Sequence, residues 1–165
     1  MSLDEFNQAD RETAIASLRP CVDISRWCEE LADGRPYDSV DDLVARAEIA
    51  AAPFTADEVE AALAHHPRIG ERASGEHAEA AMSRAEQAGV VPNDAAIADA
   101  LAAGNRAYEE KFGRVFLIRA AGRSAQEILD ALTERLDHSQ AEEEPVVAEQ
   151  LREIAVLRVK GRFAT

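Results

Sequence analysis

The stretch His65-His66-Pro67-Arg68-Ile69-Gly70 interrupts the helical pattern of the chain and decides how the rest is arranged. Proline lacks a backbone N–H and disfavours helical geometry in the residue before it, so Pro67 pushes His66 towards an extended backbone. An imidazole at such a break is held by the fold yet can face a cleft, as catalytic residues on loops often do. We therefore predict that the other segments form a scaffold around this break.

A second polar run, Ser83-Arg84-Ala85-Glu86-Gln87, follows within a predicted helix. Ser83, Glu86 and Gln87 are spaced i, i+3 and i+4, so their side chains share one helix face. This face suits the wall of a polar pocket, and a histidine beside a carboxylate is a common acid–base pair. Two plainer interpretations stay open: a hydrogen-bonded structural role for His66, and a solvated helix surface.

A charged residue also interrupts the last predicted helix. Spacings of four, three and four residues place four side chains on one stripe: Val147, Leu151, Ile154 and Arg158. A charge on an apolar stripe is costly unless it is paired, which points to an anion-binding role for Arg158 in the cavity that His66 faces. The alternatives are a side chain that extends to solvent at the helix end, or a structural ion pair.

Composition and periodicity predict an all-α fold. The chain has 165 residues, of which 47% are hydrophobic and 30% charged, and only 8 are Gly and 6 Pro. We predict a single domain over residues 1–165, a compact bundle of about eight helices. The helices are expected near 10–18, 24–32, 39–52, 55–65, 77–87, 93–112, 124–136 and 143–159. The strand-like run 115–118 is isolated, so we predict a buried extended connector there.

The charge balance and the absence of several motifs exclude some classes of function. The net charge of −14 disfavours binding to nucleic acid and to anionic membranes. No segment is apolar enough to span a bilayer, and the N-terminal residues lack a signal-peptide pattern. His65, His66 and His77 lack the i, i+4 spacing of a zinc helix, and no cysteine cluster is present, so no metal is predicted. Gly-rich phosphate loops are also absent.

The two cysteines indicate a reducing compartment. Cys21 and Cys28 are seven residues apart, which on one helix is about 10 Å, too far for a disulfide. We therefore expect reduced thiols and a cytoplasmic location. Cys28 has no neighbouring base in the sequence and is interpreted as a core residue.

An ordered set of short motifs runs through almost the whole chain. It comprises Ser25-Arg26-Trp27, Arg35-Pro36-Tyr37, 66–70, 83–89, Asn105 with Tyr108, Lys111-Phe112-Gly113, 116–118, Gly122-Arg123-Ser124 and 154–158. Together they resemble the OHCU decarboxylase family of uric acid breakdown. That resemblance implies an all-helical, cofactor-free and typically homodimeric enzyme. Its substrate would be 2-oxo-4-hydroxy-4-carboxy-5-ureidoimidazoline (OHCU), and its products (S)-allantoin and CO2.

The resemblance also implies roles for individual residues. His66 and Glu86 match the catalytic pair, and Arg158 matches the cationic group. The substrate-binding positions implied are Pro67, Ser83, Gln87, and the backbone of Leu117, Ile118, Arg119 and Ala120. Arg119 and the pair Asp137-His138 depart from the family's usual residues. The contacts between subunits and the range of ureido substrates that the site accepts therefore stay open.

Two other functions remain compatible with the sequence. One is a helical binding module that has lost catalysis, whose signature would be a disrupted His/Glu/Arg set; here all three residues are present. The other is a lyase or hydrolase of the same fold that acts on a different ureido compound.

Overall fold

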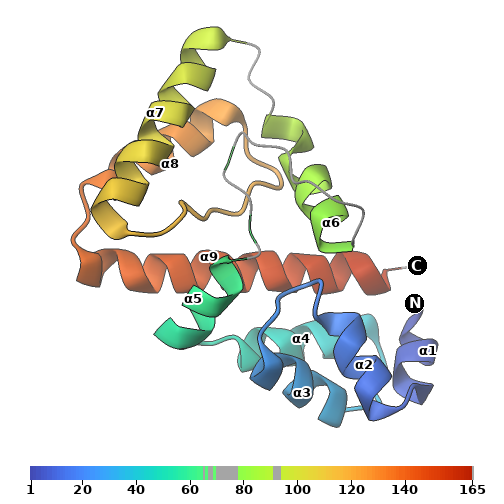
Figure 1. The fold of residues 1–165 in the computed structure, drawn as a ribbon. Coiled ribbons are helices and arrows are strands. Elements are labelled where there is room, and N and C mark those ends of the chain that lie inside the picture. Colours follow the sequence, from blue (N-terminus) through green and yellow to red (C-terminus); the bar gives the residue numbers. More distant parts are fainter. Residues whose placement is uncertain (65, 67–68, 70–77, 91–93, 165) are drawn as a thin grey trace. The chain divides into compact units, whose positions relative to one another are not determined.

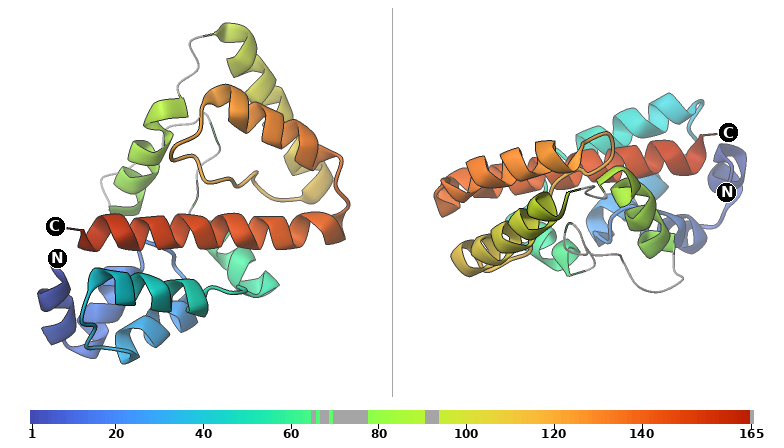
Figure 2. Two further views of the ribbon diagram at one scale, coloured as in Figure 1. Left: turned by 180° about the vertical axis from the view of Figure 1, so that it is seen from behind. Right: turned by 90° about the horizontal axis from the view of Figure 1, so that it is seen from above.

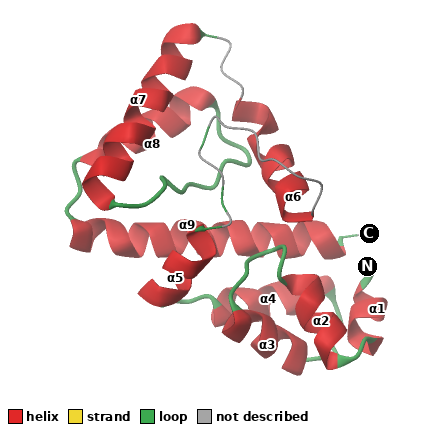
Figure 3. Cartoon of the chain, viewed as in Figure 1, coloured by secondary structure: helices red, strands yellow, loops and turns green. Residues whose placement is uncertain are grey.

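The structure, a computed structural model, describes residues 1–64, 66, 69, 78–90 and 94–164. In these ranges the chain forms nine α-helices and one short 3-10 helix, and no strand (Figures 1 and 3). The prediction of an all-α fold is confirmed. The run 115–118 forms neither helix nor strand, and Phe116, Leu117 and Ile118 are buried, as predicted for a buried connector.

The chain divides into two compact units. Unit 1 is Met1–Ala62 with Leu151–Thr165, and unit 2 is Leu63–Gln150. The helices of the N-terminal part are α1 (Leu3–Gln8), α2 (Arg11–Leu18), α3 (Ser25–Asp33), α4 (Val40–Ala50) and α5 (Ala56–Leu63). The later elements are α6 (Ala78–Gln87), η1 (Ala88–Val90), α7 (Ala95–Phe112), α8 (Ala125–Leu136) and α9 (Gln140–Phe163). Helix α9 contributes to both units, and a single domain over 1–165 stays a prediction.

The eight predicted helices all occur, and the prediction requires two corrections, one missed helix and one helix start. Helix α1 was not predicted, although Ser2 and Glu5 form a complete capping box at its N-terminus. Helix α9 begins at Gln140, before the predicted start at 143, because Ser139 and Glu142 exchange the same two hydrogen bonds. Pro145 therefore lies inside the helix rather than in its first turn.

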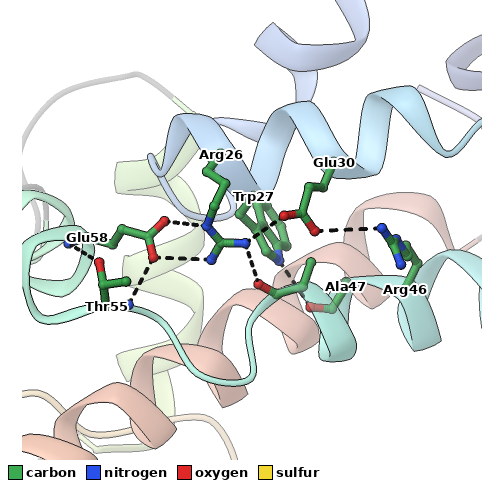
Figure 4. Close-up of polar contacts among 8 residues, drawn as sticks. Arg26, Trp27, Glu30, Arg46, Ala47, Thr55 and Glu58 are labelled. Carbon is green, nitrogen blue, oxygen red and sulfur yellow. Dashed lines mark hydrogen bonds and ion pairs between the residues drawn. The ribbon is translucent and has the colours of Figure 1, made fainter.

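In unit 1, the guanidinium group of Arg26 links helices α3, α4 and α5 (Figure 4). Nε of Arg26 on α3 donates to Oε2 of Glu58 on α5 at 2.8 Å, and Nη1 donates to Oε1 of Glu30 at 2.9 Å. The same Nη1 donates to the carbonyl of Ala50, the last residue of α4, at 3.0 Å. Because Glu58 also accepts from the backbone N–H of Thr55, one carboxylate caps α5 and anchors it to α3.

The two residues that follow Arg26 belong to the buried core of unit 1. Trp27 is fully buried, and its indole Nε1 donates to the carbonyl of Ala47 at 3.1 Å (Figure 4). Cys28 is also fully buried, and its Sγ lies 3.5 Å from the carbonyl oxygen of Val22. Burial raises the pKa of the Cys28 thiol to about 12. Cys28 is therefore a core residue, as the sequence indicated, and Cys21 and Cys28 are both free thiols.

We expect neither cysteine of the native protein to react with a thiol reagent such as iodoacetamide at pH 8. Both side chains are buried, and a thiol of pKa about 12 is thiolate in only about one molecule in ten thousand at that pH. Mass spectrometry should detect no adduct on the folded chain and two on the chain unfolded in guanidinium. Rapid labelling of Cys28 in the folded protein would contradict its assignment to the core.

Unit 2 is built on α7 and α8, which lie side by side (Figures 1 and 2). Gly104 permits their close approach, since a Cβ atom there would lie 2.5 Å from a methyl carbon of Leu132. Helix α7 ends at Gly113, whose φ of 68° is the left-handed conformation that favours glycine. The buried core is Ile69, Val90, Leu101, Tyr108, Phe112, Phe116, Ile118, Ala120, Ala125, Ile128 and Leu132.

Candidate functional site

The histidine segment leaves α5 at the predicted break. Helix α5 ends at Leu63, and the backbone N–H of His66 donates to the Leu63 carbonyl at 3.1 Å. His66 is half-buried, and its Nε2 atom is buried. Three residues later, Ile69 is buried in the core of unit 2, and its carbonyl accepts from Nδ2 of Asn105 at 2.8 Å. Pro67 lies outside the described residues.

Helix α6 carries the predicted polar face. Ser83 is 3% exposed, and Glu86 and Gln87 are half-buried. The helix therefore does not expose this face fully, which disfavours the interpretation of it as a solvated surface. After α6 the chain enters η1, and Val90 at its end is buried in the same core as Ile69.

The third predicted segment, residues 117–120, forms neither helix nor strand, and two side chains hold its backbone. Nη1 of Arg135 on α8 donates to the carbonyl of Leu117 at 2.7 Å. The backbone N–H of Arg119 donates to Oε1 of Gln150 on α9 at 2.9 Å. Ala120 accepts from the backbone N–H of Arg123 at 3.1 Å, which closes the turn before α8. The segment is thus fixed in place by partners on two helices.

These three segments share one hydrophobic core. Ile69 anchors the histidine segment, Val90 follows the polar face of α6, and Ile118 and Ala120 belong to the 117–120 segment. Side chains in one closely packed core hold the segments that carry them in a defined arrangement. Eight predicted site residues consequently belong to unit 2: His66, Ser83, Glu86, Gln87, Leu117, Ile118, Arg119 and Ala120.

Arg158, the predicted cationic group, belongs to unit 1. It is 4% exposed, and the other residues of its stripe are buried as the spacing predicted. Its Nη1 lies 3.3 Å from the carbonyl oxygen of Pro20 and 3.4 Å from that of Cys21, both beyond the usual range for a hydrogen bond of this kind. The guanidinium therefore faces the turn after α2, and its anion-binding role stays a prediction.

A buried ionic network contacts the 117–120 segment through Arg135. Glu143 is fully buried, and its Oε1 accepts from the Tyr108 hydroxyl at 2.7 Å, from Nε of Arg135 at 2.7 Å, and from Nη2 of Arg135. Its Oε2 lies 2.9 Å from Nδ1 of His138. Burial raises the pKa of Glu143, but the hydrogen bonds from Arg135, Tyr108 and His138 outweigh it and leave the pKa lowered.

Sequence reasoning missed several polar residues that hold these segments, although the sequence contained a signal for three of them. Asn105 lies on the apolar stripe of Leu101, Tyr108 and Phe112, where a buried amide calls for a partner. Arg135 continues the stripe of Ala125, Ile128 and Leu132, and Glu143 continues the stripe of α9 four residues before Val147. The fourth, Gln150, precedes a buried leucine and carried no comparable signal.

A family model for OHCU decarboxylase matches residues 7–160 of the chain. The chain belongs to the OHCU decarboxylase family. A 2-oxo-4-hydroxy-4-carboxy-5-ureidoimidazoline decarboxylase of Haloferax volcanii is 28% identical over 100% of this chain and 98% of its own length. The enzyme of that name from Halalkalicoccus jeotgali is 24% identical over 97% of this chain and 90% of its own length, and that from Amia calva is 36% identical over 58% and 55%.

Two solved structures have a similar fold. A crystal structure of OHCU decarboxylase in the presence of (S)-allantoin has a TM-score of 0.71 and 23% identity, and the match covers 95% of this chain and 100% of that chain. A crystal structure of (S)-allantoin synthase also has a TM-score of 0.71, with 16% identity over 100% of this chain and 54% of that chain. At these identities the likeness shows the fold.

Among the described residues, no three His, Cys, Asp or Glu side chains gather in a way that could hold a metal ion. No helix in the described ranges has the length and apolar character that crossing a membrane requires.

Proposed function

We propose that this protein decarboxylates 2-oxo-4-hydroxy-4-carboxy-5-ureidoimidazoline to (S)-allantoin and CO2 in the degradation of urate. The observation that carries the proposal is the match of the OHCU decarboxylase family along residues 7–160, which spans every segment predicted to contact the substrate. The common core of the 66–69, 83–90 and 117–120 segments supports it, because a site drawn from distant parts of a chain needs such a scaffold.

The chemistry needs few groups from the protein. The carboxylate of the substrate is attached to a carbon next to a ring imine, so the electron pair of the breaking C–C bond can pass into that imine as CO2 leaves. The hydroxyl group on that carbon must then lose its proton to become the ring carbonyl, and the adjacent former imine carbon must gain a proton on one face to give a single enantiomer. The protein has to orient the carboxylate out of the ring plane and manage protons at the hydroxyl and at this carbon.

We assign the proton transfers to His66 together with Glu86. His66 is held at the end of α5 with a buried Nε2, a position that excludes competing water from one ring nitrogen. The half-buried Glu86 is on a helix with the buried hydroxyl of Ser83, and Gln87 follows it. Ser83, Gln87 and Arg158 would orient the ureido and carbonyl groups, and Pro67 with the 117–120 backbone would contact the ring.

The 117–120 segment offers hydrogen-bonding groups for such a substrate. Ile118 is buried, yet among the described residues neither its N–H nor its C=O has a hydrogen-bond partner. Buried backbone groups are nearly always paired, so a ligand with both a donor and an acceptor, such as a ureido group, fits this position. The family resemblance further implies a homodimer in the cytoplasm, which light scattering and cell fractionation would test.

The test is to follow the circular dichroism of allantoin as it forms from OHCU that is generated enzymatically in the same reaction mixture. Urate oxidase and hydroxyisourate hydrolase would supply that substrate from urate, and the signal would be recorded with and without this protein. We expect rapid accumulation of (S)-allantoin, against a slow racemic background without it. No acceleration would contradict the proposal and favour a binding module or another ureido substrate.

A further inference from the structure

The structure assigns Gln150 and Arg135 as positioning residues that orient two consecutive peptide groups of the 117–120 segment. Neither residue is among those matched to the family's site. The inference rests on the proposed function, in which this backbone contacts the substrate. It adds to that function a pair of side chains that determine where the backbone donor and acceptor of Ile118 point.

The two contacts lie on either side of Ile118. Arg135 donates to the carbonyl of Leu117 at 2.7 Å, and Gln150 accepts from the N–H of Arg119 at 2.9 Å. The first bond fixes the peptide group between Leu117 and Ile118, and the second fixes the next peptide group. Both bonds have the short lengths of well-formed hydrogen bonds.

Because each peptide group is planar, fixing its C=O or its N–H also fixes the direction of the other group, which here belongs to Ile118. Both peptide groups are trans, since the cis bonds of the described chain precede Pro36 and Pro53. In a trans peptide the C=O and the N–H point in opposite directions. The N–H of Ile118 therefore points away from Arg135, and its C=O points away from Gln150. Loss of either contact would allow the corresponding peptide group to rotate.

Arg135 is itself held in one orientation. The fully buried Glu143 accepts from its Nε and Nη2, and the Tyr108 hydroxyl donates to the same carboxylate oxygen. A planar guanidinium bonded to a carboxylate through two nitrogens cannot turn, so Nη1 stays directed at Leu117. Gln150 is only half-buried and has no charge, which makes it the residue of the pair that can be replaced with the least disturbance to folding.

The test compares Gln150→Met, which keeps the size but lacks the acceptor, with Gln150→Glu, which keeps an acceptor oxygen. In the allantoin assay we expect Gln150→Met to raise KM about tenfold while kcat stays within about threefold. Gln150→Glu should restore KM to within about twofold of the unmodified protein. A purely structural role would lower the folded fraction, and with it the apparent kcat, without changing KM.

The matched control is Gln140→Met, at an exposed glutamine on the same helix whose Nε2 donates to the carbonyl of Lys111. It should leave both kcat and KM unchanged. An unchanged KM in Gln150→Met, or an equal defect in Gln150→Glu, would overturn the positioning role while the unmodified protein still turns over substrate. An inactive unmodified protein would overturn the proposed function and this inference together. Gln150→Ala repeats the comparison if the Met variant does not fold.

Discussion

Replacement of His66 by alanine is expected to lower kcat for OHCU decarboxylation by at least about a hundredfold, the usual contribution of a general acid or base. The proposed mechanism requires a group at this position that donates and accepts protons, and alanine cannot do either. Stopped-flow measurement of allantoin formation would give kcat. The handedness of the product would report separately on which residue protonates the carbon.

The matched control is His65→Ala, which removes an imidazole at the adjacent position. It should leave kcat within about threefold of the unmodified protein. A His66→Asn variant that still releases CO2 but yields racemic allantoin would identify His66 as the stereochemical acid. A fully active His66→Asn would exclude His66 from the mechanism.

Replacement of Glu143 by glutamine is expected to destabilise the protein by about 3–5 kcal/mol. The variant leaves the guanidinium of Arg135 buried without its counter-charge, since both residues are nearly inaccessible to solvent. Equilibrium unfolding in urea would measure the change in the free energy of unfolding. Glu144→Gln, at the adjacent and exposed glutamate, is the matched control and should change that free energy by less than about 0.5 kcal/mol.

The pH dependence of this effect follows from the lowered pKa of Glu143. Because its folded pKa lies below the ordinary value of 4.5, its charged form stabilises the fold fully above that value, and the stabilisation is lost as the pH falls through the folded pKa. The stability difference between the unmodified protein and Glu143→Gln should therefore be widest near neutral pH and narrow below about pH 4. A difference that does not depend on pH would contradict the ionic role of Glu143.

Local sequence signals were sufficient for most of the helical architecture. Capping residues such as Thr55 and Ser124, and the stop at Gly113, act within one turn of helix, so they can be recognised without knowledge of the tertiary structure. The missed helix α1 carries a capping signal of this kind at Ser2. The division of the chain into two compact units depends on long-range packing, which periodicity does not encode.

The support for the site was harder to predict than the segments that form it. His66 and the Ser83 face were recognised because a proline break and a helical spacing are local patterns. Gln150 and Arg135 act by reaching backbone groups more than fifteen residues away, and only the tertiary structure identifies the peptide that each contacts. Glu143 was predicted only as the start of the last helix, whereas it is fully buried and paired with Arg135.

Helix α9 has a consequence for the order in which the chain can fold. Its first part supplies Glu143 and Gln150 to unit 2, and its second part packs on unit 1, where the Phe163 ring lies 5.0 Å from that of Phe6. During synthesis at the ribosome, segment 1–62 therefore lacks part of its unit until residues about a hundred positions later have been translated. The core of unit 1 cannot be complete until this helix has emerged, so we expect segment 1–62 to finish folding only after α9 has been synthesised.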